Sequence, residues 1–164
     1  QVRAGQPARR AAQSRPRRCR ACPQRMDPRT EQLLFDYENA LNRDDIDAAV
    51  RCFMQPAVAM SEGQVFMLDT PQACAFHLGN LVARYRTLGV GTIIHRVRGY
   101  LPMGPQAAFV DVEWLFDRQG STLWTYHVGY QLVDVDGERR ILSCTSHDTP
   151  IMRGAAGERL GPGA

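Results

Sequence analysis

The chain has 164 residues, and its twenty basic residues are all arginine. This length suits a single domain that buries its own core without disulfide or metal staples. The formal net charge of +3 is unevenly placed, because residues 1–25 hold eight arginines and no acid, whereas the remainder holds twelve arginines against seventeen acids. The remainder is therefore mildly acidic and lacks the basic footprint of a nucleic-acid-binding domain. No apolar run approaches the roughly 18 residues of a membrane-spanning helix, so we expect neither nucleic acid nor membrane as a partner.

Residues 1–25 contain three prolines and show no apolar periodicity. Met26 follows, and after it Asp27 can cap a helix whose first turn begins with Pro28. We interpret residues 1–25 as a basic, disordered leader that precedes the natural start at Met26. A native disordered arm and an arginine-rich transit peptide are the alternatives.

Five cysteines are spread along the chain. Cys19 and Cys22 have a spacing found in metal sites, but no second pair follows them, so we predict neither a metal site nor a cofactor. Cys52, Cys74 and Cys144 stand singly in apolar segments and are predicted to be small core residues. The odd count and the lack of a secretory signal segment indicate a reducing compartment, and we expect a cytoplasmic protein.

The first half of the chain predicts helices interrupted by two short strands. Apolar residues recur at helical spacing, a polar turn breaks the pattern, and Thr70-Pro71 supplies a cap followed by proline at the first helical position. The predicted helices cover residues 28–43, 46–53 and 71–86, and the predicted strands cover residues 58–60 and 64–67.

After Gly89 the apolar period changes from helical to twofold, which indicates strands separated by hairpin turns at Gln119-Gly120 and Asp136-Gly137. Four strands are predicted, at residues 92–100, 107–117, 121–133 and 140–148. Short connections make the sheet largely antiparallel, and helices ahead of strands indicate an α+β fold with the helices on one face of the sheet. The predicted domain covers residues 26–150 and is followed by a flexible, glycine-rich tail at residues 151–164.

Alternation along the predicted strands assigns their side chains to two faces. The face expected to meet the helices is aromatic and apolar and holds Trp114, Tyr126, Tyr130 and, from the first long strand, His95. The opposite face is polar and holds Asp111, Glu113 and His127. We interpret the polar face as a homodimer surface, with a metal-binding cluster as the alternative.

Residues in and after the first helix have a distinctive spacing, namely Tyr37, Ala40, Leu41, Asn42, Asp45 and Asp47. With Phe53 and the strand meander, this pattern resembles the nuclear-transport-factor-like superfamily, which includes SnoaL-like polyketide cyclases, ketosteroid isomerases, scytalone dehydratases and limonene epoxide hydrolases. The resemblance spans Asp27 to Asp148 and implies a single cone-shaped domain, with helices packed on a strongly curved sheet. One cone hosts many chemistries and non-catalytic members, so the resemblance predicts the fold rather than the reaction.

Compared with ketosteroid isomerases, Tyr37 falls at the position of the tyrosine that stabilises the oxyanion. The family's aspartate base is replaced by Ser61, with Glu62 beside it, and its protonated aspartic acid is replaced by Val128. Such a site needs a base at the substrate carbon and donors at the oxyanion, so ordinary isomerase activity is not expected.

Compared with scytalone dehydratases, His95 falls near a strand histidine that the family uses in proton transfer. The family's tyrosine and aspartate after the first helix become Leu41 and Asn42 here. The sequence also lacks the arginine between two aspartates with which epoxide hydrolases activate water. The resemblance therefore supplies no complete catalytic set.

We expect a SnoaL-like protein that binds a small apolar or aromatic molecule in a buried pocket, with cofactor-free isomerisation, dehydration or cyclisation as its chemistry. In this hypothesis His95 moves the proton, Tyr37 stabilises the oxyanion and Glu62 replaces the missing base. The predicted ligand contacts are Ser61, Trp114, Tyr126 and Tyr130. The alternatives are core or solvated roles for these side chains, a ligand carrier without chemistry, and a non-catalytic homodimeric binding or assembly module.

Overall fold

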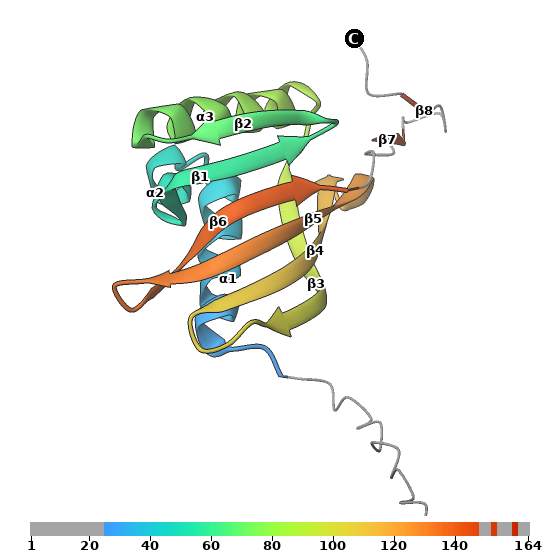
Figure 1. The fold of residues 1–164 in the computed structure, drawn as a ribbon. Coiled ribbons are helices and arrows are strands. Elements are labelled where there is room, and N and C mark those ends of the chain that lie inside the picture. Colours follow the sequence, from blue (N-terminus) through green and yellow to red (C-terminus); the bar gives the residue numbers. More distant parts are fainter. Residues whose placement is uncertain (1–24, 148–151, 154–158, 161–164) are drawn as a thin grey trace, which may run out of the picture.

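Helix caps and glycine turns divide the chain into helices followed by a sheet (Figure 1). The computed structural model describes residues 25–147 and two short strands in the tail. The helices are α1 (Pro28–Asn42), α2 (Ile46–Arg51) and α3 (Pro71–Thr87). The strands are β1 (Phe53–Ser61), β2 (Gln64–Leu68), β3 (Thr92–Pro102), β4 (Ala107–Arg118), β5 (Ser121–Val135), β6 (Glu138–Ser146), β7 (Met152–Arg153) and β8 (Arg159–Leu160).

Two of the predicted segments fall largely outside the described residues. The predicted leader lies outside them apart from Arg25, and the predicted flexible tail lies outside them apart from β7 and β8, which pair antiparallel. Within the described ranges, no helix combines the length and the apolar character needed to cross a bilayer.

Each helix begins at a side-chain cap. The caps are Asp27, Asp45 and Thr70, each of which accepts a hydrogen bond from a backbone N–H in the first turn. Proline follows the first and third caps, at Pro28 and Pro71, where its missing N–H costs no helical hydrogen bond. The predicted starts of α1 and α3 are therefore confirmed.

The second helix is shorter than the sequence predicts, because the chain leaves it before Phe53. Phe53 opens β1 and pairs with Ile141 of β6, and the register shifts between Phe53 and Val58. Such an irregularity interrupts the twofold alternation on which strand prediction depends. The prediction that the second helix runs through Phe53 is wrong, because this helix ends at Arg51. The strand predicted at residues 58–60 lies within β1, which begins earlier, at Phe53.

The six longer strands of the described chain form one mixed sheet in the order β2-β1-β6-β5-β4-β3. Neighbouring strands are antiparallel except β1 and β6, which run parallel. The hairpin turns at Gln119-Gly120 and Asp136-Gly137 have positive φ at all four residues, as two-residue turns of this kind require. Strands β2 and β3 are the edges, so the sheet is open, and the predicted α+β fold with a mainly antiparallel sheet is confirmed.

The core lies between the helices and the sheet face that the alternation assigns to them. In Figure 1, α1 crosses behind the strands of the meander and α3 lies beside β2. The buried strand residues on this face include Val110, Val112, Trp114, Phe116, Trp124, Val128, Tyr130 and Leu132. The rings of Phe116 and Trp124 stack with their centroids 4.7 Å apart. Pairs of this kind stabilise a core beyond the area that they bury.

We expect Leu34→Ala to destabilise the protein strongly and Phe35→Ala to leave its stability nearly unchanged. Leu34 is 0% exposed against the sheet, whereas its neighbour Phe35 is 55% exposed. Removing a fully buried leucine side chain costs about 2–5 kcal/mol, because a cavity remains. Urea unfolding of both variants measures the difference, and equal losses would contradict this orientation of α1.

Candidate functional site

The interior beside α1 is filled by three aromatic rings, which we call the Trp114 group (Tyr37, Trp114 and Tyr130). Tyr37 meets Trp114 and Tyr130 edge-on, with ring centroids 5.8 and 6.4 Å apart. Nε1 of Trp114 donates a hydrogen bond of 2.9 Å to the hydroxyl of Tyr130. None of the three residues is more than 4% exposed. The structure thus brings these predicted site residues together as a tightly packed group.

His95 lies on β3 at the edge of the Trp114 group, with its ring centroid 5.8 Å from that of Trp114. Nδ1 of His95 lies 2.5 Å from Oε2 of Glu38, and the same oxygen accepts a hydrogen bond of 2.7 Å from the backbone N–H of His95. Both side chains are 19% exposed, so the pair stands where the core meets solvent. Because Glu38 engages Nδ1, Nε2 is the ring nitrogen left for a ligand.

Tyr126 belongs to a second pair, in which its hydroxyl lies 2.6 Å from that of Tyr85 in α3. Burial raises the pKa of Tyr126 to about 12, although the hydrogen bond with Tyr85 acts in the opposite direction. Burial also raises the pKa of Tyr37 and of Tyr130 well above the usual 10. These phenols are therefore protonated near neutral pH and able to donate hydrogen bonds.

Ser61 is the last residue of β1, and Glu62 stands in the turn that leads to β2. Glu62 is exposed and adopts a positive φ of 50°. Among the described residues, no hydrogen bond, ion pair or ring contact links either residue to His95 or Tyr37. Their roles in base chemistry and ligand contact stay predictions. Val128, where the resemblance places a protonated acid in isomerases, is buried and 5% exposed.

A surface hollow of about 750 Å³ lies outside this interior, between α1, α2 and the β5–β6 turn. Its charged lining residues are Arg29, Asp36, Arg43, Asp45, Arg51, Glu138 and Arg139. The side chain of Arg139 is 3% exposed and lies 3.0 Å from Asp27 and 2.7 Å from Asp134. Charges of both signs line this hollow, so it presents no concentrated site for an anion or a cation.

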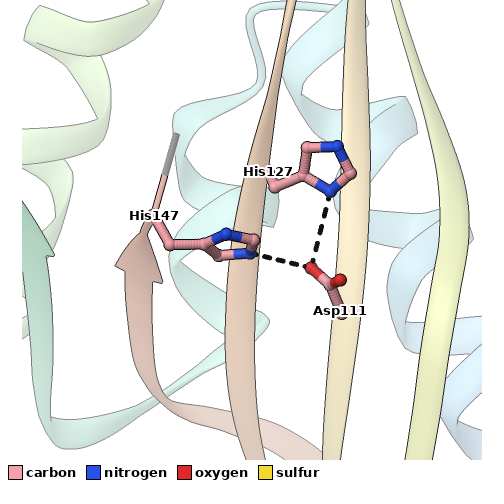
Figure 2. Close-up of side chains that lie close together, drawn as sticks. All are labelled: Asp111, His127 and His147. Atoms are coloured by element: carbon pink, nitrogen blue, oxygen red, sulfur yellow. Dashed lines mark hydrogen bonds and ion pairs between the residues drawn. The ribbon is translucent and has the colours of Figure 1, made fainter. Parts of the chain in front are cut away.

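The polar face of the sheet gathers a cluster of potential metal ligands (Figure 2), which we call the outer-face cluster (Asp111, His127 and His147). Asp111 comes from β4, His127 from β5, and His147 directly follows the end of β6. Nε2 of His147 lies 2.9 Å from Oδ1 of Asp111, and Nδ1 of His127 lies 3.7 Å from the same oxygen. Glu113 stands beside the cluster, with Oε1 3.9 Å from Nε2 of His127.

Glu38 and His147 are two residues of these sites that were not predicted from the sequence. Glu38 stands four residues after the buried Leu34, a spacing that places a carboxylate beside the inward stripe of α1. The backbone N–H of His147 donates to the carbonyl of His127 at 3.2 Å, so strand pairing continues one step beyond β6. His147 falls inside the last predicted strand, but the register of the turn, continued without a shift, places Ser146 opposite His127. The register shift between Gln131 and Leu132 brings His147 there instead, and no local pattern predicts that shift.

Comparison with known proteins agrees with this architecture. Residues 27–149 match the model of a family described as NTF2-like protein (DUF6841), whereas no curated protein matches the sequence. An NTF-2-like protein of unknown function from Shewanella oneidensis is 21% identical, with a TM-score of 0.60 over 73% of this chain and 97% of that one. A ketosteroid isomerase-like protein from Erwinia carotovora is 17% identical, with a TM-score of 0.54 over 71% and 90% of the two chains. A de novo designed protein with a curved β-sheet is 16% identical, with a TM-score of 0.51 over 73% and 99%.

The predicted resemblance to the nuclear-transport-factor-like superfamily is thereby confirmed. At these identities, the likeness to the solved structures concerns the fold alone.

We expect alkaline pH to destabilise the protein through its buried tyrosines. The pKa of an unperturbed tyrosine is near 10, whereas burial in the folded protein raises the pKa of Tyr126 to about 12. Between these values the folded state binds more protons than the unfolded state, so the free energy of unfolding falls as pH rises. Urea unfolding at about pH 9 and about pH 11 measures the fall, which should be smaller in Tyr126→Phe. An equal fall in the variant would contradict the burial of this hydroxyl.

Proposed function

The chain belongs to this NTF2-like family, and we propose that it binds a small, cyclic and largely apolar molecule and transfers a proton on it without a cofactor. Isomerisation, dehydration and cyclisation are the reactions of this class. The observation that carries the proposal is the contact between Glu38 and His95 beside Trp114. An imidazole that is oriented by a carboxylate can act as a general base, and the aromatic rings beside it offer an apolar surface for the ligand.

Glu38 orients His95 in two ways in this proposal. Its Oε2 accepts hydrogen bonds from the backbone N–H of His95 and, in the tautomer protonated at Nδ1, from the ring. That tautomer leaves the lone pair on Nε2, and the carboxylate stabilises the imidazolium that forms when Nε2 takes a proton. Glu38 thus serves as a positioning residue, and His95 is the group that moves the proton.

The Trp114 group supplies the hydrogen-bond donors and the apolar walls of the proposed site. Because Trp114 donates to the hydroxyl oxygen of Tyr130, the hydroxyl hydrogen of Tyr130 can point to a ligand oxygen. The hydroxyl of Tyr37 makes no hydrogen bond to any of the described residues, and it is the second donor. Protonated phenols in an apolar surrounding stabilise a negative oxygen that develops during proton transfer.

The ligand reaches this site from the side of His95 in the proposal. Tyr37, Trp114 and Tyr130 are closed off from solvent, whereas Glu38 and His95 each keep 19% exposure between α1 and β3. A ring inserted here contacts the imidazole first and then the face or edge of Trp114. A ligand ring about the size of a tyrosine ring can replace the edge-on contacts that Tyr37 makes with its aromatic neighbours.

The cysteines of the described chain favour this non-covalent chemistry over a thiol nucleophile. Cys52, Cys74 and Cys144 are free, and burial raises the pKa of Cys52 and of Cys144 to about 12 and that of Cys74 to about 11. Thiols with such values are unreactive near neutral pH. Free thiols also suit a reducing compartment, and we place the proposed activity in the cytoplasm.

We expect the wild-type protein to exchange hydrogen for deuterium on a bound cyclic ketone in heavy water. Deuterium incorporation into a panel of fused-ring enones and hydroxylated aromatic ketones is followed by NMR. This measurement reports proton abstraction even when the natural substrate is not known. His95→Gln should lower the exchange rate by about 10²–10⁴-fold, the usual contribution of a general base. Glu38→Gln should lower the rate while the dissociation constant, measured by equilibrium dialysis, changes little.

His77→Gln is the matched control, because His77 lies on α3 and contacts the ring of Phe66 instead. This variant should exchange at the wild-type rate. Equal exchange by wild type and His95→Gln, or no binding across the panel, would overturn the proposed proton transfer.

A second candidate function, a homodimeric binding module, is favoured by apolar side chains on the outer face of the β1–β2 hairpin. Met60, Val65 and Met67 are 38%, 61% and 58% exposed. Met60 and Val65 pair directly across the hairpin, while the alternate residues Ala57 and Ala59 face the core. Exposed apolar side chains grouped in this way are typical of protein–protein contacts, and the occupant that we propose is a second copy of this chain.

We expect Val65→Glu to convert a dimer into a monomer in sedimentation-velocity experiments, because a charge would be buried against its own copy. Phe76→Glu is the control: Phe76 is 74% exposed, but it lies on α3 rather than on the hairpin. A monomeric wild type, or a variant Val65→Glu that remains a dimer, would exclude this interface.

A further inference from the structure

We propose that the outer-face cluster is a binding site for a divalent transition-metal ion of the zinc class, with Asp111, His127 and His147 as its ligands. This site lies on the sheet face opposite the Trp114 group and is independent of the proposed proton transfer. The proposal departs from the expectation, drawn from the sequence, that the chain binds no metal.

The ligand atoms already lie close to a coordinating geometry. Nε2 of His147 and Nδ1 of His127 lie 2.9 and 3.7 Å from Oδ1 of Asp111, and the three ligand atoms are all within 4.8 Å of one another. Ligands about 2.0–2.1 Å from a tetrahedral zinc ion stand roughly 3.3 Å apart, so the observed separations bracket the required one. Two imidazoles with one carboxylate suit zinc, cobalt or iron.

The backbone fixes the positions from which these ligands project. Asp111 pairs with Gly129 in the sheet, and His127 stands two residues before Gly129 on the same strand. The backbone N–H of His147 donates to the carbonyl of His127, so two of the ligands are tied together by the main chain. Their rings lie 5.4 Å apart between centroids, on the same side of the sheet (Figure 2). Ligands held on paired strands lose little conformational freedom when a metal binds.

Phe109 forms an apolar wall beside the cluster. It stands two residues before Asp111 on β4, and its ring occupies the space over Gly129, where a Cβ would lie 2.8 Å from the ring. A glycine at this position therefore lets an aromatic ring cover the sheet next to the ligands. An apolar neighbour lowers the local dielectric constant and strengthens the attraction between a cation and a carboxylate.

Glu113 stands next to His127, where an outer support for a metal-bound histidine would lie, at a distance that must shorten for a hydrogen bond to form. Its Oε1 lies 3.9 Å from Nε2 of His127, the ring nitrogen that does not face Asp111, and its side chain is only 13% exposed. Its Oε2 is buried without a hydrogen-bond partner among the described residues, and Nε of Arg98 is 3.4 Å away. A carboxylate that receives the second N–H of a ligating imidazole fixes the tautomer and raises the basicity of the metal-bound nitrogen.

The nearby charges and the solvent exposure of the ligands indicate how the site would bind an ion. Two arginines neighbour Glu113, because Arg96 pairs with it across β3 and β4 and Nε of Arg98 lies 3.4 Å from its Oε2. The negative charge at the ligand atoms themselves therefore comes from Asp111. The side chains of Asp111, His127 and His147 are 29%, 24% and 45% exposed, which leaves the fourth coordination position open to solvent. Three protein ligands with an open position are typical of sites where the ion holds water or an exchangeable ligand.

The test is a titration of the metal-free full-length chain with Co²⁺, followed by absorption spectroscopy, and with Zn²⁺, followed by calorimetry. We expect one ion per chain and a Co²⁺ spectrum without thiolate charge-transfer bands, because the ligands are nitrogen and oxygen. His147→Ala and Asp111→Asn should each weaken binding at least tenfold, and Glu113→Gln should weaken it by about 10–100-fold. His77→Ala, which removes a histidine from α3, should bind like the wild type.

The cysteine pair Cys19 and Cys22 requires its own control, since its spacing also suits zinc. Cys19→Ser/Cys22→Ser should retain the N/O-ligated ion in full. Thermal unfolding of each metal-free variant separates lost ligands from lost structure: His147→Ala should melt like the wild type while failing to gain stability on addition of Zn²⁺. Absence of binding, binding retained in Asp111→Asn/His147→Ala, or binding lost with the two cysteines would each overturn the site.

Discussion

Trp114 is the residue on which the interior of this fold depends. It is 2% exposed, and its ring contacts Tyr37 from α1, His95 from β3 and Tyr130 from β5. Three elements that are distant in the sequence therefore meet at one indole. Its N–H would be costly to bury alone, and the hydroxyl of Tyr130 satisfies it. That hydrogen bond orients the two inward rings of β4 and β5 relative to each other.

The sheet has two faces with different chemistry, and each carries a histidine held by a carboxylate. On the inner face, Glu38 engages His95 beside aromatic rings that exclude water. On the outer face, Asp111 engages His147 where solvent has access. The same pair of side-chain types thus leads to different proposals, because the dielectric surroundings and the number of neighbouring ligands differ.

Much of the fold could be predicted from local patterns, because caps and alternation act over a few residues. Asp27, Thr70 and the two glycine turns placed α1, α3 and the long strands correctly. The start of β1 was missed, since Phe53 is held in the sheet by pairing with Ile141, a contact that no local pattern contains. Glu38 was missed for a similar reason: its role depends on His95, 57 residues further along the chain. Alternation placed Asp111 and His127 on one face, but it could not show the register shift between Gln131 and Leu132 that brings His147 beside His127.

Strand β6 joins two blocks of the sheet that otherwise share no pairing. The β1–β2 hairpin forms one block and β3–β4–β5 the other, and in the strand order only β6 stands between them. Because β6 is the last of the six strands along the chain, a nascent chain on the ribosome holds two unjoined sheets with exposed edges until residue 146 has left the exit tunnel. The pairing of β1 with β6 then closes a long stretch of chain in one late step, which slows folding. Edge-to-edge aggregation is a risk mainly before this pairing forms, while the strand edges are exposed.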